Sequence, residues 1–207
     1  HEVARKGLQY RVENENDMEI CGQAANASDG LKTIPRCNPD IAIVDLMLPD
    51  KSGLELIEDI GKRWPDLAVL VMSARDESLF AERALRAGAL GYVMKSQGLN
   101  SLVEGIHTVL RGDIYVSREM TGRMIKKYVG ADHLPPRSCA GSLTNRELQV
   151  FERLGCGYTT SEIADTLSIS RQTVQSHKEN IKKKLELENS STLLQHAILW
   201  VLSEDGI

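Results

Sequence analysis

Short apolar runs alternate with amphipathic segments along the first 115 residues of the chain. Three of these runs, at 41–44, 67–72 and 91–94, are apolar throughout, as are the strands of a parallel sheet that helices cover on both faces. A shorter run at 19–22 is also expected to be a strand. The order of the elements predicts an α/β domain with a doubly wound parallel sheet. The segments with helical spacing are 4–12, 31–34 (ending at Pro35), 53–63, 76–87 and 99–111.

The pattern changes near residue 117. A helix-like segment at 117–128 is followed by residues 130–142, which contain Pro135 and Pro136 but little apolar material. Such a composition is typical of an interdomain linker. We therefore divide the chain into a first domain at 1–116, a linker helix with a proline-containing linker at 117–141, and a second domain at 142–207.

The second domain has helical periodicity throughout. Glu147 and Glu162 each lie three residues after a threonine, which is the spacing of a capping box, where a hydroxyl and a carboxylate bond the first N–H groups of a helix. Four helices are therefore expected, and the domain is predicted to be all-α. The expected starts of these helices are at Thr144, Thr159, Ser170 and Asn189.

The composition is that of an ordinary globular protein. Of the 207 residues, 42% are apolar and 26% are charged, and the net charge is −4, which excludes a mainly disordered chain. Because the apolar runs are far shorter than the roughly 20 residues of a membrane-spanning helix, no membrane partner is expected. No segment has the pattern of a signal peptide. The four cysteines lack the spacing of a zinc site, which favours reduced thiols and a cytoplasmic location.

Three polar side chains follow the predicted strands. Asp45, Ser73 and Lys95 each stand directly after one of the three apolar runs. Because the carboxyl ends of parallel strands meet at one edge of a sheet, we expect these side chains to converge there. A carboxylate nucleophile, a hydroxyl donor and an ammonium group can together accept a phosphoryl group and hold its oxygens. The sequence therefore predicts a phosphoryl-accepting site.

The spacing of these residues resembles that of a known family. The segment 45–53 (DLMLPDKSG), the pair at 73–74 and the run 91–95 are similar to the receiver domain of bacterial two-component response regulators, over residues 1 to about 115. The resemblance implies a flavodoxin-like fold and a sensor histidine kinase as partner. It further implies that Asp45 is the phosphoacceptor, that Ser73 senses the phosphoryl group and that Lys95 is its counter-ion.

The same resemblance implies a metal ion and a switch residue. The cofactor is Mg²⁺, held by Asp45 and by the main-chain carbonyl of Met47, together with an acidic pair at the end of the first strand. Tyr92 is the aromatic residue expected to rotate inward on activation. A ring that simply packs over the last strand is the alternative for Tyr92.

The start of the sequence departs from the receiver pattern. Residues 1–5 already read as the first helix of a receiver, so the first strand and its acidic pair are missing. In the family this strand lies between two others, and without it their separation is about 9.5 Å, too far for sheet hydrogen bonds. Either about ten residues are missing from the sequence, or the domain is rearranged and does not hold Mg²⁺ normally; we favour missing residues.

Positive charge is concentrated in one segment of the second domain. Residues 171–185 hold five Lys or Arg side chains and one acidic residue, Glu179. On a helical wheel Val174, Ile181 and Leu185 point in one direction, which must face a core. The opposite side is polar and basic, as in a helix that reads base edges and contacts phosphates.

From the polar side we expect Gln175, Ser176 and Glu179 to contact base edges, since Gln can pair with adenine and Glu can accept from cytosine. A structural salt bridge is the alternative for Glu179, and a solvated helix face is the alternative for the whole stripe. We expect His177 to be structural. The candidate phosphate contacts are Thr144, Thr160, Arg171, Thr173, Lys178, Lys182 and Lys183.

Residues 142 to about 205 resemble the LuxR-type helix-turn-helix domain of the NarL/FixJ subfamily, through the segments LTNREL at 143–148 and TVQSHKENI at 173–181 together with 162–164, 167–170 and 184–185. The resemblance implies double-stranded DNA as partner, with RNA polymerase as a further one. It also places a homodimer contact on the last helix, with packing inside the domain as the alternative. The expected dimer residues are Leu194, Ala197, Ile198 and Val201.

Together these features predict a DNA-binding response regulator, not an enzyme, that is switched when a sensor histidine kinase phosphorylates Asp45. The alternative is an atypical receiver that serves as a phosphorylation-independent dimerisation or protein-interaction module on a DNA-binding protein. An enzyme with an external substrate is not favoured, because no second motif for a catalytic cleft is present.

Overall fold

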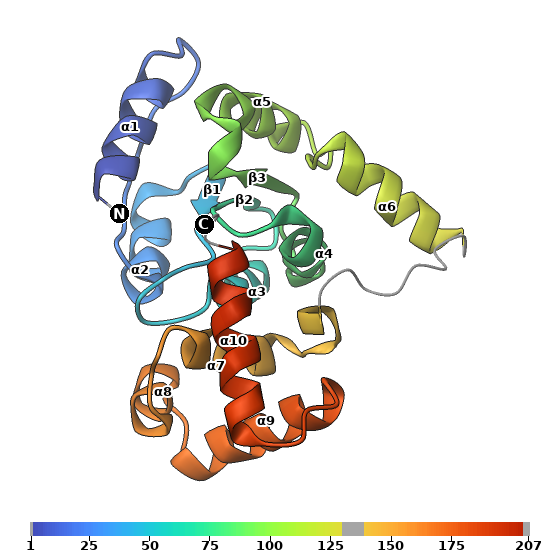
Figure 1. Cartoon of the computed structure of the whole chain (residues 1–207). Coiled ribbons are helices and arrows are strands. Elements are labelled where there is room, and N and C mark those ends of the chain that lie inside the picture. Colours follow the sequence, from blue (N-terminus) through green and yellow to red (C-terminus); the bar gives the residue numbers. More distant parts are fainter. Residues whose placement is uncertain (1, 130–138, 205–207) are drawn as a thin grey trace. The chain divides into compact units, whose positions relative to one another are not determined.

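The computed structural model describes the backbone of residues 2–129 and 139–204 (Figure 1). The chain divides into two compact units, His1–Val129 and Gly130–Ile207. The prolines expected to mark the linker, Pro135 and Pro136, lie outside the described residues. The two units are therefore described one at a time.

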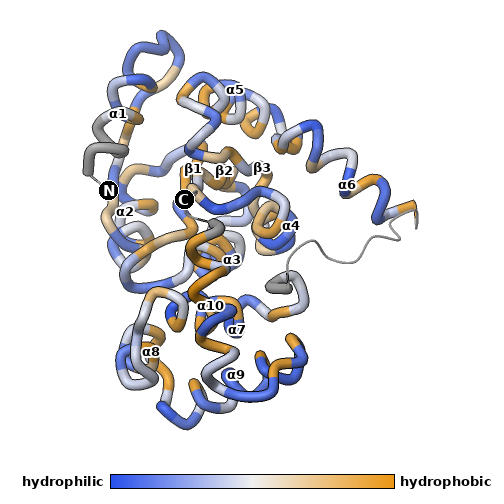
Figure 2. The backbone as a smooth tube through the Cα atoms, in the orientation of Figure 1, coloured by the Kyte–Doolittle hydropathy of each residue, from blue (hydrophilic) through white to orange (hydrophobic). Residues whose placement is uncertain are grey.

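The first unit is built on a parallel three-stranded sheet in the order β1-β2-β3. The strands are β1 (Ile41–Val44), β2 (Ala68–Ser73) and β3 (Gly91–Met94), as the three apolar runs predict, and they are mostly apolar along their length (Figure 2). In the register Val44 pairs with Val71, and Ser73 pairs with Met94. The carboxyl ends of the three strands therefore lie side by side.

Helices cover both faces of this sheet (Figure 1). One face carries α1 (Glu2–Glu13) and α5 (Leu99–Leu110), whose Val12, Leu102 and Ile106 form a buried cluster with Leu70 and Val93 of the strands. On the other face lie α3 (Gly53–Arg63) and α4 (Glu77–Ala87), with Ile57 and Ile60 of α3 fully buried. These helices match the predicted segments, with Ser52 and Asp76 as N-caps of α3 and α4.

The strand predicted at 19–22 is not formed. Residues 18–24 belong to no strand, and β1 is paired only with β2. A segment becomes a sheet strand only through hydrogen bonds to a neighbouring strand. In the described part of the chain, residues 18–24 have no such neighbour, and the side of β1 away from β2 is unpaired. Consequently β1 is only half-buried at Ile41, Ala42 and Ile43, although its sequence is that of a central strand.

The prediction that Pro35 ends the second helix was also wrong. The helix α2 spans Ala27–Cys37 and contains Pro35 in its last turn. A proline removes one backbone donor, which near the end of a helix costs a single hydrogen bond. The helix ends instead at Asn38, which has the left-handed φ of 47° and donates its N–H to the carbonyl of Ile34.

The helix α6 (Arg118–Tyr128) belongs to the first unit, whereas the sequence analysis placed it in the linker. Ser117 caps the helix, and its N–H donates to the Glu77 carboxylate on α4 at 2.7 Å. Near the other end of α6 the Lys127 ammonium donates to Glu82 of α4 at 2.8 Å. Two polar contacts thus fix α6 along α4.

The second unit contains the four predicted helices. Both expected capping boxes are present, with Thr144 and Thr159 as the N-caps. Phe151, Ile163, Ile181 and Leu193 form much of the core, all with at most 1% of their surface exposed. None of the described helices is long and apolar enough to span a membrane. The four helices are α7 (Asn145–Gly155), α8 (Thr160–Leu167), α9 (Arg171–Lys184) and α10 (Ser190–Glu204), preceded by a short 3-10 helix η2 (Cys139–Ser142).

Candidate phosphorylation site and nucleic-acid interface

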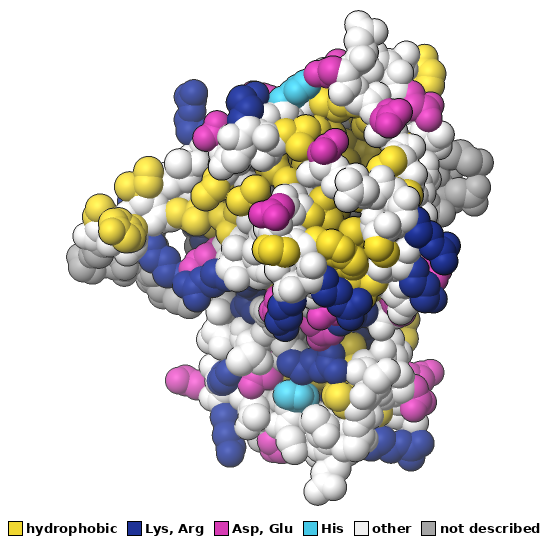
Figure 3. Space-filling view, turned by 180° about the vertical axis from the view of Figure 1, so that it is seen from behind, with side chains coloured by type: hydrophobic (Ala, Val, Ile, Leu, Met, Phe, Trp, Pro, Cys, Tyr) yellow, Lys and Arg dark blue, Asp and Glu magenta, His cyan; other side chains and the backbone are white. Residues whose placement is uncertain are grey.

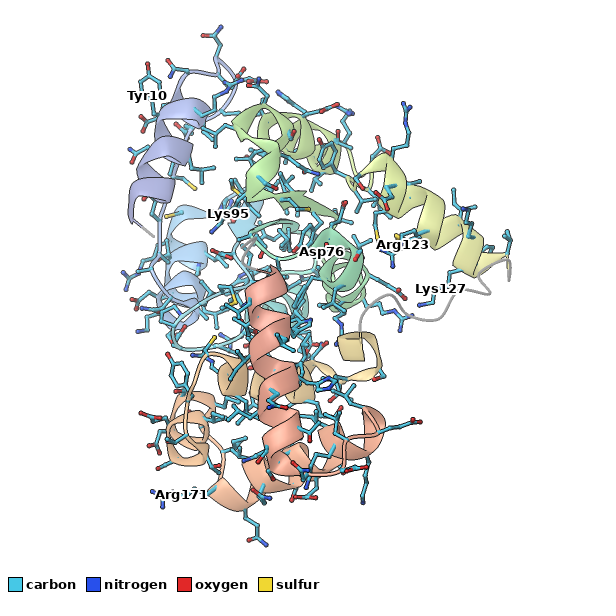
Figure 4. All side chains as sticks on the ribbon, in the orientation of Figure 1. Tyr10, Asp76, Lys95, Arg123, Lys127 and Arg171 are labelled. Atoms are coloured by element: carbon cyan, nitrogen blue, oxygen red, sulfur yellow. The ribbon has the colours of Figure 1, made fainter. Side chains whose placement is uncertain are left out.

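An ion pair joins two of the three predicted residues at the carboxyl edge of the sheet. Asp45 follows β1 directly, and Lys95 begins the 3-10 helix η1 (Lys95–Gln97) after β3. The Lys95 ammonium donates to Oδ2 of Asp45 at 2.6 Å, and each side chain is 27% exposed. The other carboxylate oxygen, Oδ1, accepts from the N–H of Met47 at 3.1 Å. The Asp45 carboxylate is thus fixed in place and remains partly open to solvent. Its partner Lys95 is labelled in Figure 4.

Ser73 ends the central strand β2, between the strands that carry Asp45 and Lys95. Its side chain is fully buried, and Oγ accepts the N–H of Arg75 at 3.2 Å. A hydroxyl that accepts one bond still has a proton to donate. The strand that ends in this hydroxyl therefore lies between the strands that precede Asp45 and Lys95.

Tyr92 lies inside the first unit. Its ring is 1% exposed, and its hydroxyl donates to the carbonyl of Arg75 at 2.8 Å. Ser73 and Tyr92 thus hold the two sides of one residue, its N–H and its carbonyl, just before the N-cap of α4 at Asp76 (Figure 4). Both contacts therefore converge on the residue that precedes the start of α4.

The loop after β1 contains contacts that the sequence analysis missed. The Asp50 carboxylate accepts the N–H groups of Ala27 and Ser28 at the start of α2, at 2.9 and 3.0 Å. Burial raises the pKa of Asp50, but these backbone N–H groups outweigh it, so the pKa lies below its ordinary value. A side chain at Gly53 would place its Cβ 2.3 Å from the carbonyl oxygen of Asp45, so this position needs glycine.

Arg75 is a further residue that the sequence analysis did not identify. It is only 6% exposed, and its guanidinium reaches Sδ of Met47 at 3.5 Å. Its N–H donates to Ser73, and its carbonyl oxygen accepts from Tyr92. Only its distance of two residues from Ser73 could have suggested a role, and that signal is weak without the geometry.

The described residues do not form a complete Mg²⁺ site. Asp45 and the main-chain carbonyl of Met47 are the two expected oxygen donors, and Asp45 is paired with Lys95. No group of three or more His, Cys, Asp or Glu side chains in the described ranges is placed to hold a metal ion. Mg²⁺ prefers six oxygen ligands, several of them water, so two donors account for only part of such a site.

In the second unit, α9 has the two faces that the helical wheel predicts. Val174 and Ile181 are fully buried, whereas Gln175 and Ser176 are exposed. Leu185 follows the helix and is half-buried. On the side of the unit seen in Figure 3, basic side chains alternate with acidic ones, so any attraction for a polyanion is local to parts of the surface.

Glu179 forms a hydrogen bond and a salt bridge with other residues of α9. The Gln175 amide donates to Oε1 of Glu179 at 3.0 Å, and the Lys182 ammonium lies 2.9 Å from Oε2. The hydrogen bond from Lys182 is the main reason that the pKa of Glu179 lies below its ordinary value. The salt bridge expected as the alternative for Glu179 is therefore present. Because a carboxylate only accepts, the Gln175 carbonyl oxygen must point away from Glu179.

The candidate phosphate contacts are in different local environments. Arg171 and Lys183 are exposed (Arg171 is labelled in Figure 4). Lys178 reaches Thr160 Oγ1 at 3.5 Å, and Lys182 is 17% exposed beside Glu179. The hydroxyls of Thr144 and Thr173 serve caps, Thr144 by accepting the N–H of Glu147 and Thr173 by bonding Ser170.

The expected dimer residues of α10 point in two directions. Ala197 and Val201 are buried in the core, where a Cβ on Gly155 of α7 would lie 2.3 Å from the Ala197 carbonyl oxygen. Leu194 and Ile198 are 41% and 38% exposed. The helix therefore packs inside its unit and also presents apolar side chains outward. Of the four expected dimer residues, Leu194 and Ile198 are the accessible ones.

Comparison with known proteins gives the family of both units. Residues 1–107 match the family described as the response regulator receiver domain, and residues 141–197 match the family described as bacterial regulatory proteins, luxR family. The oxygen regulatory protein NreC of Staphylococcus carnosus (strain TM300) is 32% identical over 202 residues, covering 96% of this chain and 93% of NreC. The transcriptional regulatory protein DegU of Brevibacillus brevis is 26% identical over 211 residues, covering 96% of this chain and 89% of DegU.

A solved structure agrees in fold. RcsB from Salmonella enterica serovar Typhimurium, bound to the promoter rprA in the presence of phosphomimetic BeF3−, has a TM-score of 0.71 at 22% identity, covering 96% of this chain and 94% of RcsB. The receiver and luxR-family matches follow one another in the expected order, and a relative is 32% identical along nearly the whole chain. This protein therefore belongs to the bacterial response regulators of the NarL/FixJ type, a family of DNA-binding transcription regulators.

Proposed function

We propose that Asp45 is the residue through which this response regulator is switched, by accepting a phosphoryl group from a sensor histidine kinase. The observation that carries the proposal is the Asp45–Lys95 contact of 2.6 Å at the edge of the sheet, where the carboxylate is both oriented and accessible. We place the protein in the cytoplasm, where a kinase and DNA are both within reach.

The transfer needs few groups. An oxygen of Asp45 attacks the phosphorus of the kinase's phosphohistidine, the phosphorus–nitrogen bond breaks, and the imidazole nitrogen leaves with the electron pair. Lys95 balances the charge on the phosphoryl oxygens, and the Ser73 hydroxyl donates to one of them. The receiver family uses Mg²⁺ for phosphorylation; for this chain we propose Mg²⁺ with ligands beyond Asp45 and Met47, because those two do not complete a site.

Phosphorylation would act on the rest of the unit through Arg75. When Ser73 turns its hydroxyl toward a phosphoryl group, the bond that it accepts from the Arg75 N–H changes, and Tyr92 holds the carbonyl of that same residue. The start of α4 lies next in the chain, and Glu77 and Glu82 join α4 to α6. Through this chain of contacts we propose α6 as the element that responds and Tyr92 as a switch residue. The Tyr92 ring is already buried, at 1% exposed, so its part is to hold the Arg75 carbonyl and not to rotate inward from the surface.

For DNA we propose that α9 reads the major groove. Gln175 is exposed and donates one amide hydrogen to Glu179, which leaves its carbonyl oxygen and its other amide hydrogen to pair with adenine. Ser176 and Glu179 complete the base-reading set, and the seven candidates named above contact phosphates. Leu194 and Ile198 supply apolar side chains for a homodimer on two half-sites, and RNA polymerase is a further partner.

The main test uses Asp45→Asn with Asp66→Asn as matched control, because Asp66 is an exposed aspartate before the start of β2, not at the carboxyl end of a strand. Each protein is incubated with Mg²⁺ and a small phosphodonor such as acetyl phosphate, and intact mass is measured. We expect one added phosphoryl group on the unchanged chain and on the control, and none on Asp45→Asn. Equal labelling of all three proteins, with the label mapped elsewhere, would overturn the assignment of Asp45.

One observation favours the second candidate function, a receiver that acts without phosphorylation. The described residues supply only two of the expected Mg²⁺ donors. If this reading holds, the unchanged chain takes up no phosphate, while DNA binding persists and is the same with and without phosphodonor. Gel retardation in both conditions distinguishes the two functions.

A further inference from the structure

Two cysteines far from the phosphorylation site lie against each other in the first unit. Cys21 stands in the extended segment before α2, and Cys37 is the last residue of α2. The Cys37 thiol donates to the carbonyl oxygen of Cys21 at 2.9 Å. Both are free thiols, Cys21 exposed and Cys37 half-buried.

The glycine next to Cys21 makes this contact close. A Cβ on Gly22 would lie 2.7 Å from Sγ of Cys37 and 3.6 Å from its Cβ. For Cys21 itself the contact is the 2.9 Å between its carbonyl oxygen and Sγ of Cys37. The backbone of Cys21 therefore lies beside the thiol with which it would form a disulfide. Burial raises the pKa of the Cys21 thiol, and the adjacent Cys37 thiol raises it further.

We propose that Cys21 and Cys37 are an oxidisable dithiol that forms a reversible intramolecular disulfide with a peroxide. Because the raised pKa of Cys21 disfavours its thiolate, Cys37 attacks first: its thiolate bonds a peroxide oxygen, the O–O bond breaks, and a sulfenic acid and hydroxide result. The hydroxide takes up the proton that the Cys37 thiol released and becomes the first water. The other thiol then attacks that sulfur, the S–O bond breaks, and a second water leaves. Two sulfurs give up two electrons in total, and hydrogen peroxide is reduced to two molecules of water.

The bridge would join an unpaired segment to a helix. Residues 18–24 belong to no strand, whereas α2 is held at its other end by Asp50 of the loop that follows Asp45. A disulfide would fix the segment to the C-terminal end of α2 and restrict the unfolded chain. We therefore expect a higher thermal midpoint in the oxidised protein. The proposal does not depend on phosphorylation of Asp45.

The test is peptide mapping of the full chain after treatment with hydrogen peroxide and alkylation of the remaining thiols. Trypsin cleaves after Arg11, Lys32, Arg36 and Lys51, so Cys21 and Cys37 fall in separate peptides, 12–32 and 37–51. We expect these peptides to be joined without reductant and separate after dithiothreitol. The protein should remain a monomer on a non-reducing gel.

Variants test whether the disulfide forms specifically between Cys21 and Cys37. Cys37→Ser should abolish the linked peptide, and Cys156→Ser should leave it unchanged. Gly22→Ala keeps all four cysteines but inserts a methyl group where the Cys37 sulfur lies, so the linked peptide should form several-fold more slowly. The proposal is overturned if Cys21 and Cys37 stay alkylatable after peroxide, if either bridges Cys139 or Cys156 instead, or if only intermolecular dimers form.

Discussion

The two units differ in how their functional groups are distributed along the chain. In the first unit Asp45, Ser73 and Lys95 stand at the carboxyl ends of three neighbouring strands, and Asp45 and Lys95 are in contact. In the second unit the candidate groups lie mostly on the single helix α9, and several of them also bond one another. The first arrangement concentrates the chemistry in a few atoms, and the second spreads it over a surface. Single substitutions should therefore abolish function in the first unit and weaken it by degrees in the second.

After Asp45→Asn, which should take up no phosphoryl group, the largest effect is expected for Lys95→Ala. Removing one positioned charge from a transferring phosphoryl group should slow phosphorylation about 100- to 1,000-fold, by analogy with loss of a single donor to a developing anion. Stability should change by no more than about 1 kcal/mol, because Lys95 and Asp45 are partly exposed and their ion pair is screened. The rate of phosphate incorporation by mass spectrometry and the thermal midpoint test both parts.

Lys62→Ala is the matched control, because Lys62 is an exposed lysine in the last turn of α3. It should retain the rate of the unchanged protein. A Lys95→Ala protein that is phosphorylated as fast as this control would show that the first unit does not concentrate its chemistry at the sheet edge.

Substitutions on α9 should have a smaller effect that depends on the role of each side chain. Gln175→Ala should cost about 1–3 kcal/mol on the preferred site and relax the preference at one base pair, whereas Arg171→Ala should weaken all sequences alike and lower the salt slope by about one. Selection of bound fragments from random DNA, followed by titration at several salt concentrations, measures both. If both variants lose affinity equally for every sequence, α9 binds phosphates and does not read bases.

The strands and helices that have a clear local sequence pattern could be predicted from the sequence. The strand at 91–94 and the helix at 53–63 were found at these residues, because apolar runs and capping residues act over short distances. The meeting of Asp45 and Lys95 also followed, since parallel strands bring their ends together. The prediction of a strand at 19–22 was wrong, because a strand forms only by pairing with a neighbouring strand, and that neighbour can lie far away in the sequence.

Side-chain partners were harder to predict than backbone elements. Asp50 bonds the start of α2 across more than 20 residues, and nothing in the local sequence selects that pairing. On α10 the four expected dimer residues are all apolar, so the pattern alone does not separate Ala197, which is buried, from Ile198, which is exposed. Similarly, the sequence offered base reading and a salt bridge for Glu179, and only the geometry shows the Lys182 contact.

The smallest effect is expected at a charge of the second unit that serves structure. Lys184 of α9 donates to Glu147 of α7 at 2.6 Å, and the Glu147 side chain is 5% exposed. Burial raises the pKa of Glu147, but the bonds from Lys184 and Thr144 outweigh it and hold the pKa below its ordinary value of 4.5. The carboxylate therefore stabilises the fold at pH above about 4.5, and this contribution is lost as the pH falls through the lowered pKa.

Lys184→Ala should accordingly lower the free energy of unfolding by about 1 kcal/mol at pH 7, because Lys184 is partly exposed and the pair is screened. At acid pH, once the Glu147 carboxylate has been protonated, the difference from the unchanged protein should shrink. Lys183→Ala, one residue earlier and exposed, should leave stability unchanged at both pH values while weakening DNA binding. Urea unfolding at the two pH values separates these outcomes. Equal destabilisation by both variants would contradict the assignment of Lys184 to stability and of Lys183 to DNA binding.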